Sequence, residues 1–174
     1  PSETKILSVK YENNLAKIYF SKDLLDIDAS LEEKMIEAIV YTVTSIDEVD
    51  KIIIYVEGNI LTKLPKSKIN LPSTLDRNFG INKVYDFTKT NNINQVTVYY
   101  LNKNDDDYYY VPVTKYLNDD RDKIKIIIDE LTSYNTYNTN LMSYLNSNTE
   151  LLAIEEQRKL KWLIICLTYL HFST

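Results

Sequence analysis

The 174-residue sequence is poor in the residues on which many small enzymes depend. It contains two glycines (Gly58 and Gly80), one cysteine (Cys166) and one histidine (His171). A glycine-rich phosphate loop needs several glycines, because side chains would keep the backbone N–H groups away from the phosphate. A Cys/His zinc site needs several ligands, and a single cysteine excludes an intrachain disulfide. Of the enzyme classes considered, this composition leaves open only catalysis by carboxylates, since there are 25 acidic residues.

Positive charge and long apolar runs are also scarce. The net charge is −5, from 20 basic and 25 acidic residues, which argues against a nucleic-acid partner. The sequence contains no run of 18 apolar residues, the minimum length for a membrane-spanning helix. No signal peptide is recognisable either. Because the chain begins with Pro1, we expect a segment upstream of it. We expect no cofactor and no metal site.

The apolar pattern predicts an α+β fold: an antiparallel or mixed sheet with helices packed on one face. Ser30 and Glu33 predict a capping box for the first helix. Its buried face should carry Leu31, Met35, Ala38, Ile39, Thr42, Val43 and Ile46. The expected elements are a hairpin (4–21), a helix (30–46), strands (51–57, 95–101, 108–114 and 150–154), a second helix (119–132) and a helical turn (141–145). Residues 51–57 are nearly all apolar, which predicts burial on both sides, and Pro112 predicts a sheet edge or a bulge.

The first hairpin sequence recurs near the end of the chain. Residues 4–21 align without gaps with residues 149–166, so that Leu7 corresponds to Leu152 and Val9 to Ile154. This indicates tandem domains of about 145 residues, although apolar alternation also recurs by chance in β proteins. We therefore predict the C-terminal half of a first repeat (1–58), an ordered connector (59–94) and the N-terminal part of a second repeat (95–174). On this interpretation the chain is a fragment, and one hypothesis is that its two partial repeats close into a single core.

The end of the chain, 162–172, is strongly apolar. A break inside the second repeat, or a shifted reading frame after Lys161, would explain this composition. Cys166 and His171 lie in this segment, so we do not expect either to have a functional role.

Several short motifs occur in a characteristic order. The connector carries Leu71-Pro72, Leu75-Asp76-Arg77, Phe79-Gly80-Ile81-Asn82 and Tyr85-Asp86, between the strand KIIIYVEG (51–58) and the strands VTVYY (96–100) and YYVPVT (109–114). In this order and spacing, with a Gly-Ile-Asn connector, the chain resembles the GerM family of sporulation and spore-germination proteins. The abundance of residues with AT-rich codons also suits an endospore-forming bacterium.

The resemblance implies tandem α+β domains similar to the ring-building motifs of secretion and sporulation proteins. It also implies a lipoprotein, outside the cytoplasm, anchored in the mother-cell membrane by an upstream lipid that this chain lacks. Such a protein would support the channel complex between mother cell and forespore, with channel proteins and further copies of itself as partners. The family offers no catalytic residues, so we expect no enzyme.

The second pair of predicted strands is rich in tyrosine. Tyr99, Tyr100, Tyr109 and Tyr110, with Tyr108 beside them, are candidates for an interaction surface. They could stack on sugars or anchor a protein partner, and the alternative is cross-strand packing within the sheet. A cell-wall carbohydrate-binding module is therefore the alternative function to the assembly module.

Charged residues provide weaker candidates. Arg77, one of few arginines, is expected to form a hydrogen-bonded fork to backbone carbonyls or a carboxylate, or to lie at a partner surface. The acid pairs Asp26/Asp28 and Glu32/Glu33 could serve catalysis, but a solvated face is the expected setting. The aspartates at 105–107 and 119–122 do not match a calcium loop.

Overall fold

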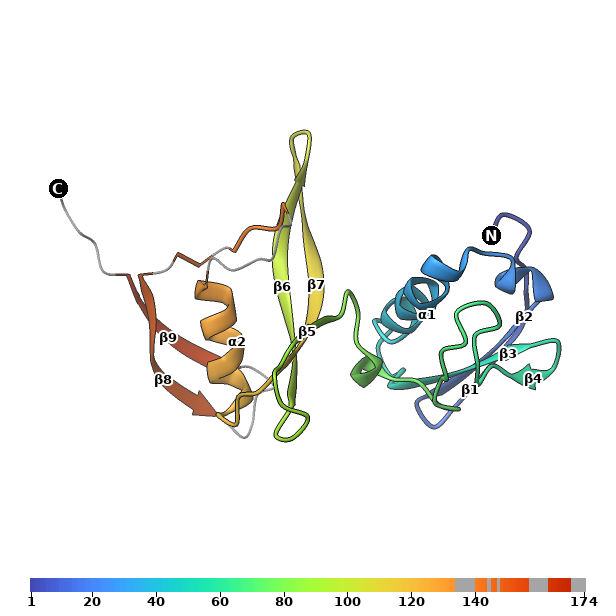
Figure 1. The fold of residues 1–174 in the computed structure, drawn as a ribbon, viewed down its shortest axis with the longest axis horizontal. Coiled ribbons are helices and arrows are strands. Elements are labelled where there is room, and N and C mark those ends of the chain that lie inside the picture. Colours follow the sequence, from blue (N-terminus) through green and yellow to red (C-terminus); the bar gives the residue numbers. More distant parts are fainter. Residues whose placement is uncertain (134–139, 144, 147, 157–162, 170–174) are drawn as a thin grey trace. The chain divides into compact units, whose positions relative to one another are not determined.

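A computed structural model describes residues 1–133, 140–143, 145, 146, 148–156 and 163–169 of the chain, and only the backbone of 150, 152–156 and 163–169. The chain forms two compact units, Pro1–Asn82 (unit 1) and Lys83–Thr174 (unit 2), shown in Figure 1. Each unit has its own cluster of buried apolar residues. The hypothesis of a single core is therefore wrong.

Unit 1 is a four-stranded mixed sheet with one main helix. Its elements are β1 (Ile6–Glu12), β2 (Leu15–Phe20), the 3-10 helix η1 (Lys22–Leu25), α1 (Ala29–Val43), β3 (Lys51–Val56), β4 (Asn59–Ile60) and the 3-10 helix η2 (Arg77–Phe79). The strand order is β1-β2-β3-β4, in which β2 and β3 are parallel and the other two pairs antiparallel. α1 forms the crossover between the parallel strands. The predicted first hairpin is confirmed, and Asn13 and Asn14 supply its turn with φ angles of 52° and 60°.

Only one side of β3 is buried. Ile52, Ile54 and Val56 lie in the core, whereas Ile53 and Tyr55 are half-buried on the other side. There the ring of Tyr55 stacks on that of Tyr19 at a centroid distance of 4.4 Å. The prediction of burial on both sides was wrong, because long apolar runs do not reveal that helices cover one side of a sheet only.

The buried face of α1 is rotated from the predicted one. Glu32, Ile36 and Val40 are fully buried, whereas Leu31 and Ile46 are 43% and 59% exposed. The helix begins after Asp28, and no side-chain capping bond forms, so the predicted capping box is wrong. The rotation follows from two inward-facing glutamates, Glu32 and Glu37, which accept hydrogen bonds from loop N–H groups. An apolar pattern cannot anticipate buried carboxylates.

The predicted connector is ordered, but it is divided between the two units. Leu61, Leu64, Leu71 and Leu75 are buried in the core of unit 1, and the units divide after Asn82. The division therefore coincides with neither predicted boundary, 58/59 or 94/95, because these leucines complete the core of unit 1. The assignment of the units to halves of repeats stays a prediction.

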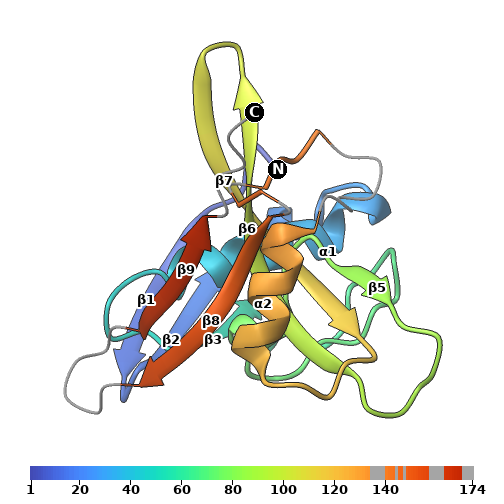
Figure 2. The ribbon, with the colours of Figure 1, turned by 90° about the vertical axis from the view of Figure 1, so that its left-hand side faces the viewer.

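In its described residues, unit 2 contains two small sheets and one helix. Its elements are β5 (Val84–Asp86), β6 (Asn94–Asn104), β7 (Asp107–Leu117), α2 (Lys123–Thr132), β8 (Thr149–Glu156) and β9 (Leu163–Tyr169). One sheet has the order β5-β7-β6, and β8 and β9 form a separate antiparallel hairpin. Figures 1 and 2 show α2 between the long β6–β7 hairpin and the β8–β9 hairpin, and it contacts both β6 and β8.

Some local predictions for unit 2 were wrong at the ends of elements. α2 begins at Lys123 rather than at residue 119, since the side chain of Asp122 accepts the Ile124 N–H at 2.9 Å and caps the helix. Met142 lies in an extended bridge to Leu101, not in a helical turn.

Pro112 lies in the central strand of its sheet, but β5 pairs only with residues 115–117 of β7. The β5 ladder thus covers residues 115–117 of β7 and does not reach Pro112.

The two copies of the repeated hairpin share a backbone irregularity. The register shifts at Leu7 in β1 and at Leu152 in β8, positions that differ by the predicted offset of 145. In the second strands, however, Tyr19 and Cys166 occupy equivalent positions, an offset of 147. The ungapped alignment therefore holds for the first strand and is displaced by two residues in the second.

None of the helices in the described parts of the chain combines the length and the apolar character that crossing a bilayer requires.

Candidate functional site

The β6–β7 hairpin separates its tyrosines onto two sides. In its antiparallel register Tyr99 pairs with Pro112, Leu101 with Tyr110, and Lys103 with Tyr108. Directly paired residues point to the same side, so these six share one side of the sheet. Tyr100 and Tyr109 alternate with them and lie on the other side, which carries the core residues Val98 and Val113.

Tyr100 belongs to the core and not to a surface. Its side chain is 1% exposed, and its hydroxyl donates to the carbonyl of Glu130 at 3.4 Å. Lys115 is also buried there, in an ion pair with the Glu130 carboxylate. The prediction of Tyr100 as a surface residue was wrong, because the inner side of this strand faces α2.

The other side of the hairpin carries an exposed aromatic surface. We call Tyr99, Leu101, Tyr108, Tyr110 and Met142 the outer tyrosine face. The exposed fractions are 46% for Tyr99, 61% for Tyr108, 67% for Tyr110 and 42% for Met142. Leu101, Tyr108, Tyr110, Met142 and Ser143 line an open groove of about 580 Å³. The face lies toward the tip of the hairpin, which extends beyond the rest of unit 2 in Figure 1.

Met142 is the member of this face that the sequence did not reveal. Its N–H donates to the Leu101 carbonyl at 2.7 Å, and the Leu101 N–H donates to the Met142 carbonyl at 2.8 Å. The Ser143 hydroxyl donates to the carbonyl of Leu131, near the end of α2. These bonds hold residues 142 and 143 beside β6. Such a pairing of two distant single residues has no local sequence signal.

The charged groups near the groove do not form a polar cleft. The Lys103 ammonium lies 5.6 Å from the centroid of the Tyr108 ring, and Asp105, Asp106 and Asp107 are exposed at the turn. Among the described residues, no group of His, Cys, Asp and Glu side chains has a geometry that could hold a metal ion. The described lining of the groove therefore offers mainly aromatic and apolar contact area.

Arg77, the remaining candidate, lies in unit 1 and braces its helix. Its Nε donates to the Thr44 hydroxyl at 3.1 Å, and an Nη donates to the Tyr41 carbonyl at 3.4 Å. The guanidinium carbon also lies 5.1 Å from the centroid of the Tyr41 ring. Arg77 thus joins η2 to the C-terminal turn of α1 through a backbone carbonyl and a hydroxyl. A contact of Arg77 with a partner stays a prediction.

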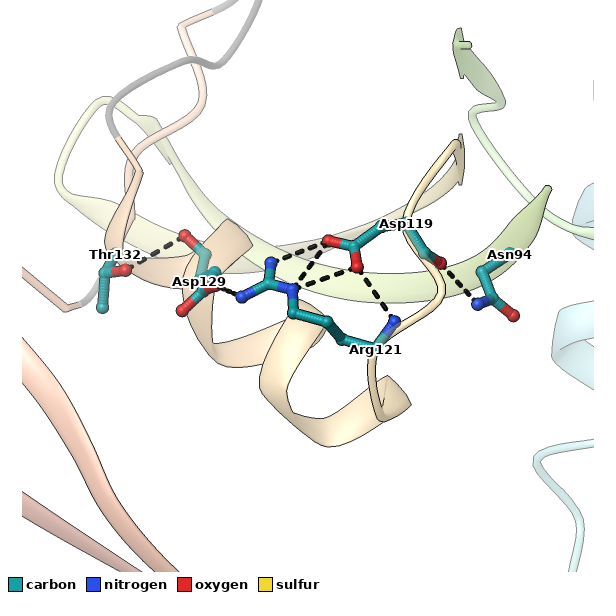
Figure 3. A network of polar contacts seen from close by, with 5 residues as sticks. All are labelled: Asn94, Asp119, Arg121, Asp129 and Thr132. Atoms are coloured by element: carbon teal, nitrogen blue, oxygen red, sulfur yellow. Dashed lines mark hydrogen bonds and ion pairs between the residues drawn. The ribbon is translucent and has the colours of Figure 1, made fainter. Parts of the chain in front are cut away.

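A second arginine organises the start of α2, as Figure 3 shows. The Arg121 side chain donates to Asp119 (the shortest distance is 2.7 Å) and to Asp129 at 2.6 Å. These hydrogen bonds lower the pKa of the Asp119 carboxyl below its ordinary value, although burial opposes the change. The carbonyl of Asp119 accepts from the Asn94 side chain, so the network ties α2 to β6. Its role is structural.

The two predicted acid pairs lie in different environments. Asp26 is almost fully exposed, whereas the Glu32 carboxylate is buried and accepts the N–H groups of Lys66 and Ser67 at 3.1 and 2.6 Å. The expectation of a solvated face was therefore wrong for Glu32. Its hydrogen bonds hold the loop that follows β4, which is again a structural role.

Comparison with known proteins decides the family. The family model for sporulation and spore germination matches residues 1–62. The spore germination protein GerM of Bacillus subtilis (strain 168) is 32% identical over 136 residues, which are 75% of this chain and 36% of that protein. The chain belongs to the GerM family. The solved tandem GerMN domains of B. subtilis GerM match it with a TM-score of 0.82 and 25% identity, over 89% of this chain and 56% of that one.

The GerM likeness confirms the predicted α+β fold and the tandem arrangement. The chain is a homologue of a protein of sporulation and spore germination. It spans 36% of the length of B. subtilis GerM.

Proposed function

We propose that this chain is a non-catalytic module that supports assembly of the channel complex between mother cell and forespore. Its GerM family membership supports a role in sporulation, and its geometry supports binding through surfaces. The protein would act outside the cytoplasm, tethered to the mother-cell membrane by a lipid on a segment beyond this chain. Its partners would be the channel proteins and further copies of itself.

The observation that carries the proposal is the outer tyrosine face. Tyrosine is enriched among the residues that dominate protein–protein binding energies, because it combines a large apolar ring with a hydroxyl and loses little side-chain entropy. Tyr99, Tyr108 and Tyr110 are exposed on one side of a hairpin whose other side is anchored by Tyr100. Exposed rings on a hairpin that is anchored in the core suit docking better than catalysis.

The test uses the full-length protein in sporulating cells. The double variant Tyr108→Ser/Tyr110→Ser removes two rings from the outer face, whereas Tyr109→Ser removes one from the same strand on the other side. Tyr109 is 45% exposed, so its replacement is a matched control. We expect co-purification of channel proteins to fall about 30-fold in the double variant, as for loss of one strong anchor residue, and to be retained in the control. Equal recovery from both variants would contradict the proposal.

A cell-wall carbohydrate-binding module is the second candidate, favoured by the row of exposed tyrosines along an open groove. Aromatic side chains can stack on sugar rings. The same variants test it: purified chain is sedimented with insoluble cell-wall polymer. Binding that disappears in Tyr108→Ser/Tyr110→Ser and persists in Tyr109→Ser would favour this function. Absence of sedimentation, together with co-purified channel proteins, would favour the assembly module.

A further inference from the structure

The side of the unit 1 sheet that faces away from its core is both apolar and basic. Strand alternation and register place six residues of the two central strands on this side: Leu15, Lys17, Tyr19, Lys51, Ile53 and Tyr55. We call these six, together with their neighbours Lys10 of β1 and Ile60 of β4, the basic sheet face. The residues that alternate with the six in β2 and β3 are all buried in the core of unit 1. The basic sheet face is therefore the outer surface of the sheet, opposite to α1.

Three ammonium groups gather on this face of an otherwise acidic protein. Lys10 and Lys17 are direct cross-strand partners, and Lys51 is a diagonal neighbour of Lys17. Like charges at directly opposite positions destabilise a sheet. Within the described part of the chain, none of the three lysines forms an ion pair, although Glu12 lies on the same side of β1. The whole chain has a net charge of −5, so the sheet carries a local excess of positive charge that weakens its own pairing.

Large apolar and aromatic side chains lie between these lysines. The rings of Tyr19 and Tyr55 stack at a centroid distance of 4.4 Å, and the Lys10 ammonium lies 5.5 Å from the centroid of the Tyr19 ring. Ile60, the partner of Tyr55, is 39% exposed. Tyrosine and lysine side chains suit the boundary between lipid headgroups and hydrocarbon, because each joins an apolar part to a polar end. The basic sheet face thus combines charge for phosphate groups with apolar area for the layer beneath them.

Size and charge favour a membrane over other anionic partners. Four strands about 4.8 Å apart and five residues along β2 outline an area on the order of 400 Å², about half of what each partner buries in a stable protein complex. A second copy would place lysines against lysines, which repel each other. A hydrophilic phosphate polymer would contact the ammonium groups but leave Ile53 and Ile60 in water. The headgroup region of a phospholipid membrane accepts both kinds of side chain.

We propose that the basic sheet face docks unit 1 on the surface of an anionic phospholipid membrane. Each lysine near such a surface strengthens binding about fivefold, so the three together contribute about 100-fold. The inference rests on the lipid tether of the proposed function, because three lysines alone bind a membrane weakly and a tether keeps the face within reach of it. Docking would direct α1, on the core side of the sheet, away from the lipid.

The experiment attaches the full chain to vesicles through an N-terminal histidine tag and a nickel-chelating lipid, which replace the tether. In a Cys166→Ser background, Ser8→Cys carries a polarity-sensitive dye beside Tyr19 on the outer side of the sheet, and Lys34→Cys carries it at an exposed position of α1. On vesicles with about one third phosphatidylglycerol at low salt, we expect a blue shift of the dye at position 8 and none at position 34. Phosphatidylcholine vesicles with the same nickel lipid, or salt at about 0.5 M, should abolish the shift.

Two triple variants, each measured with the dye at position 8, test the lysines. Lys10→Gln/Lys17→Gln/Lys51→Gln should lower the ratio of docked to undocked chain about 100-fold. The matched control Lys22→Gln/Lys34→Gln/Lys63→Gln removes the same charge from exposed positions elsewhere in unit 1 and should leave this ratio within about threefold. The Tyr108→Ser/Tyr110→Ser variant should dock normally, so that failure of docking and failure of the channel-assembly proposal are separate results.

The absence of a shift at position 8, an equal shift at both positions, or a shift that the first triple variant retains would overturn the proposal. Binding of soluble polyphosphate through the same lysines, with no response on vesicles, would also overturn it, because the partner would then be an anionic polymer. A shift at position 8 that depends on protein concentration without vesicles would overturn it as well, since a second copy would then cover the face.

Discussion

Replacing Glu32 by alanine should destabilise unit 1 more than almost any other polar substitution in it. The carboxylate is fully buried and accepts the N–H groups of Lys66 and Ser67 at 3.1 and 2.6 Å. A hydrogen bond to a charged group contributes about 1.5–3 kcal/mol, and its loss leaves a buried donor without a partner. Two such bonds give an expected loss of about 3–6 kcal/mol, a large part of the stability of a small domain. The bonds also hold the loop that carries Leu64 and Leu71 into the core.

The assay is urea denaturation followed by far-UV circular dichroism, with hydrogen exchange of residues 61–71 to localise the effect. Lys34→Ala, at an exposed position on the same helix, is the control and should change the stability by no more than about 0.5 kcal/mol. A loss below about 1 kcal/mol for Glu32→Ala, with normal exchange in the loop, would refute the reasoning. It would mean that water or other groups satisfy the two N–H groups.

The same carboxylate predicts a pH dependence. Burial raises the pKa of Glu32, but hydrogen bonds from Ser67 and Lys66 and the Lys66 charge lower it more, so that the pKa lies below its ordinary value of 4.5. A group whose pKa is lower in the folded state contributes stability above its unfolded pKa and loses it as the pH falls. The stability difference between the wild type and Glu32→Gln should therefore be constant near neutral pH and shrink below about pH 4.5. A difference that grows on acidification would contradict this assignment.

Three further predictions concern unit 2. Arg121→Gln removes hydrogen bonds that lower the pKa of Asp119, so an NMR titration should show the Asp119 pKa rising toward its ordinary value; an unchanged pKa would refute the network. Asp122→Ala removes the cap on the Ile124 N–H and should cost about 1 kcal/mol in urea denaturation, whereas Asp122→Asn should cost little. Tyr100→Phe loses one long hydrogen bond and should cost about 1 kcal/mol or less, whereas Tyr100→Ala should cost about 3–5 kcal/mol because it empties a core position. Similar losses for the two Tyr100 variants would argue against its burial.

The candidate site was predictable only in part. Alternating tyrosines and a polar turn identify an aromatic hairpin, because strand periodicity and turn chemistry are local properties of the chain. Which side of the hairpin faces α2 is not local. The side was decided by packing, which buries Tyr100 and leaves Tyr99, Tyr108 and Tyr110 exposed. Met142 joined the face through a bridge between residues far apart in the sequence.

Composition and local apolar patterns were enough to predict the α+β class, the two hairpins, the ordered connector and the family resemblance. All of these depend on residue types and spacings within short stretches. The orientation of α1, the division of the chain after Asn82 and the structural role of Glu32 depend instead on tertiary contacts. In each case the deciding interaction joins distant segments: a carboxylate with a loop 34 residues away, or connector leucines with the sheet. The free energy of these tertiary contacts outweighs the local conformational preference of the chain. The contacts join residues far apart in the sequence, so a local sequence pattern does not reveal them.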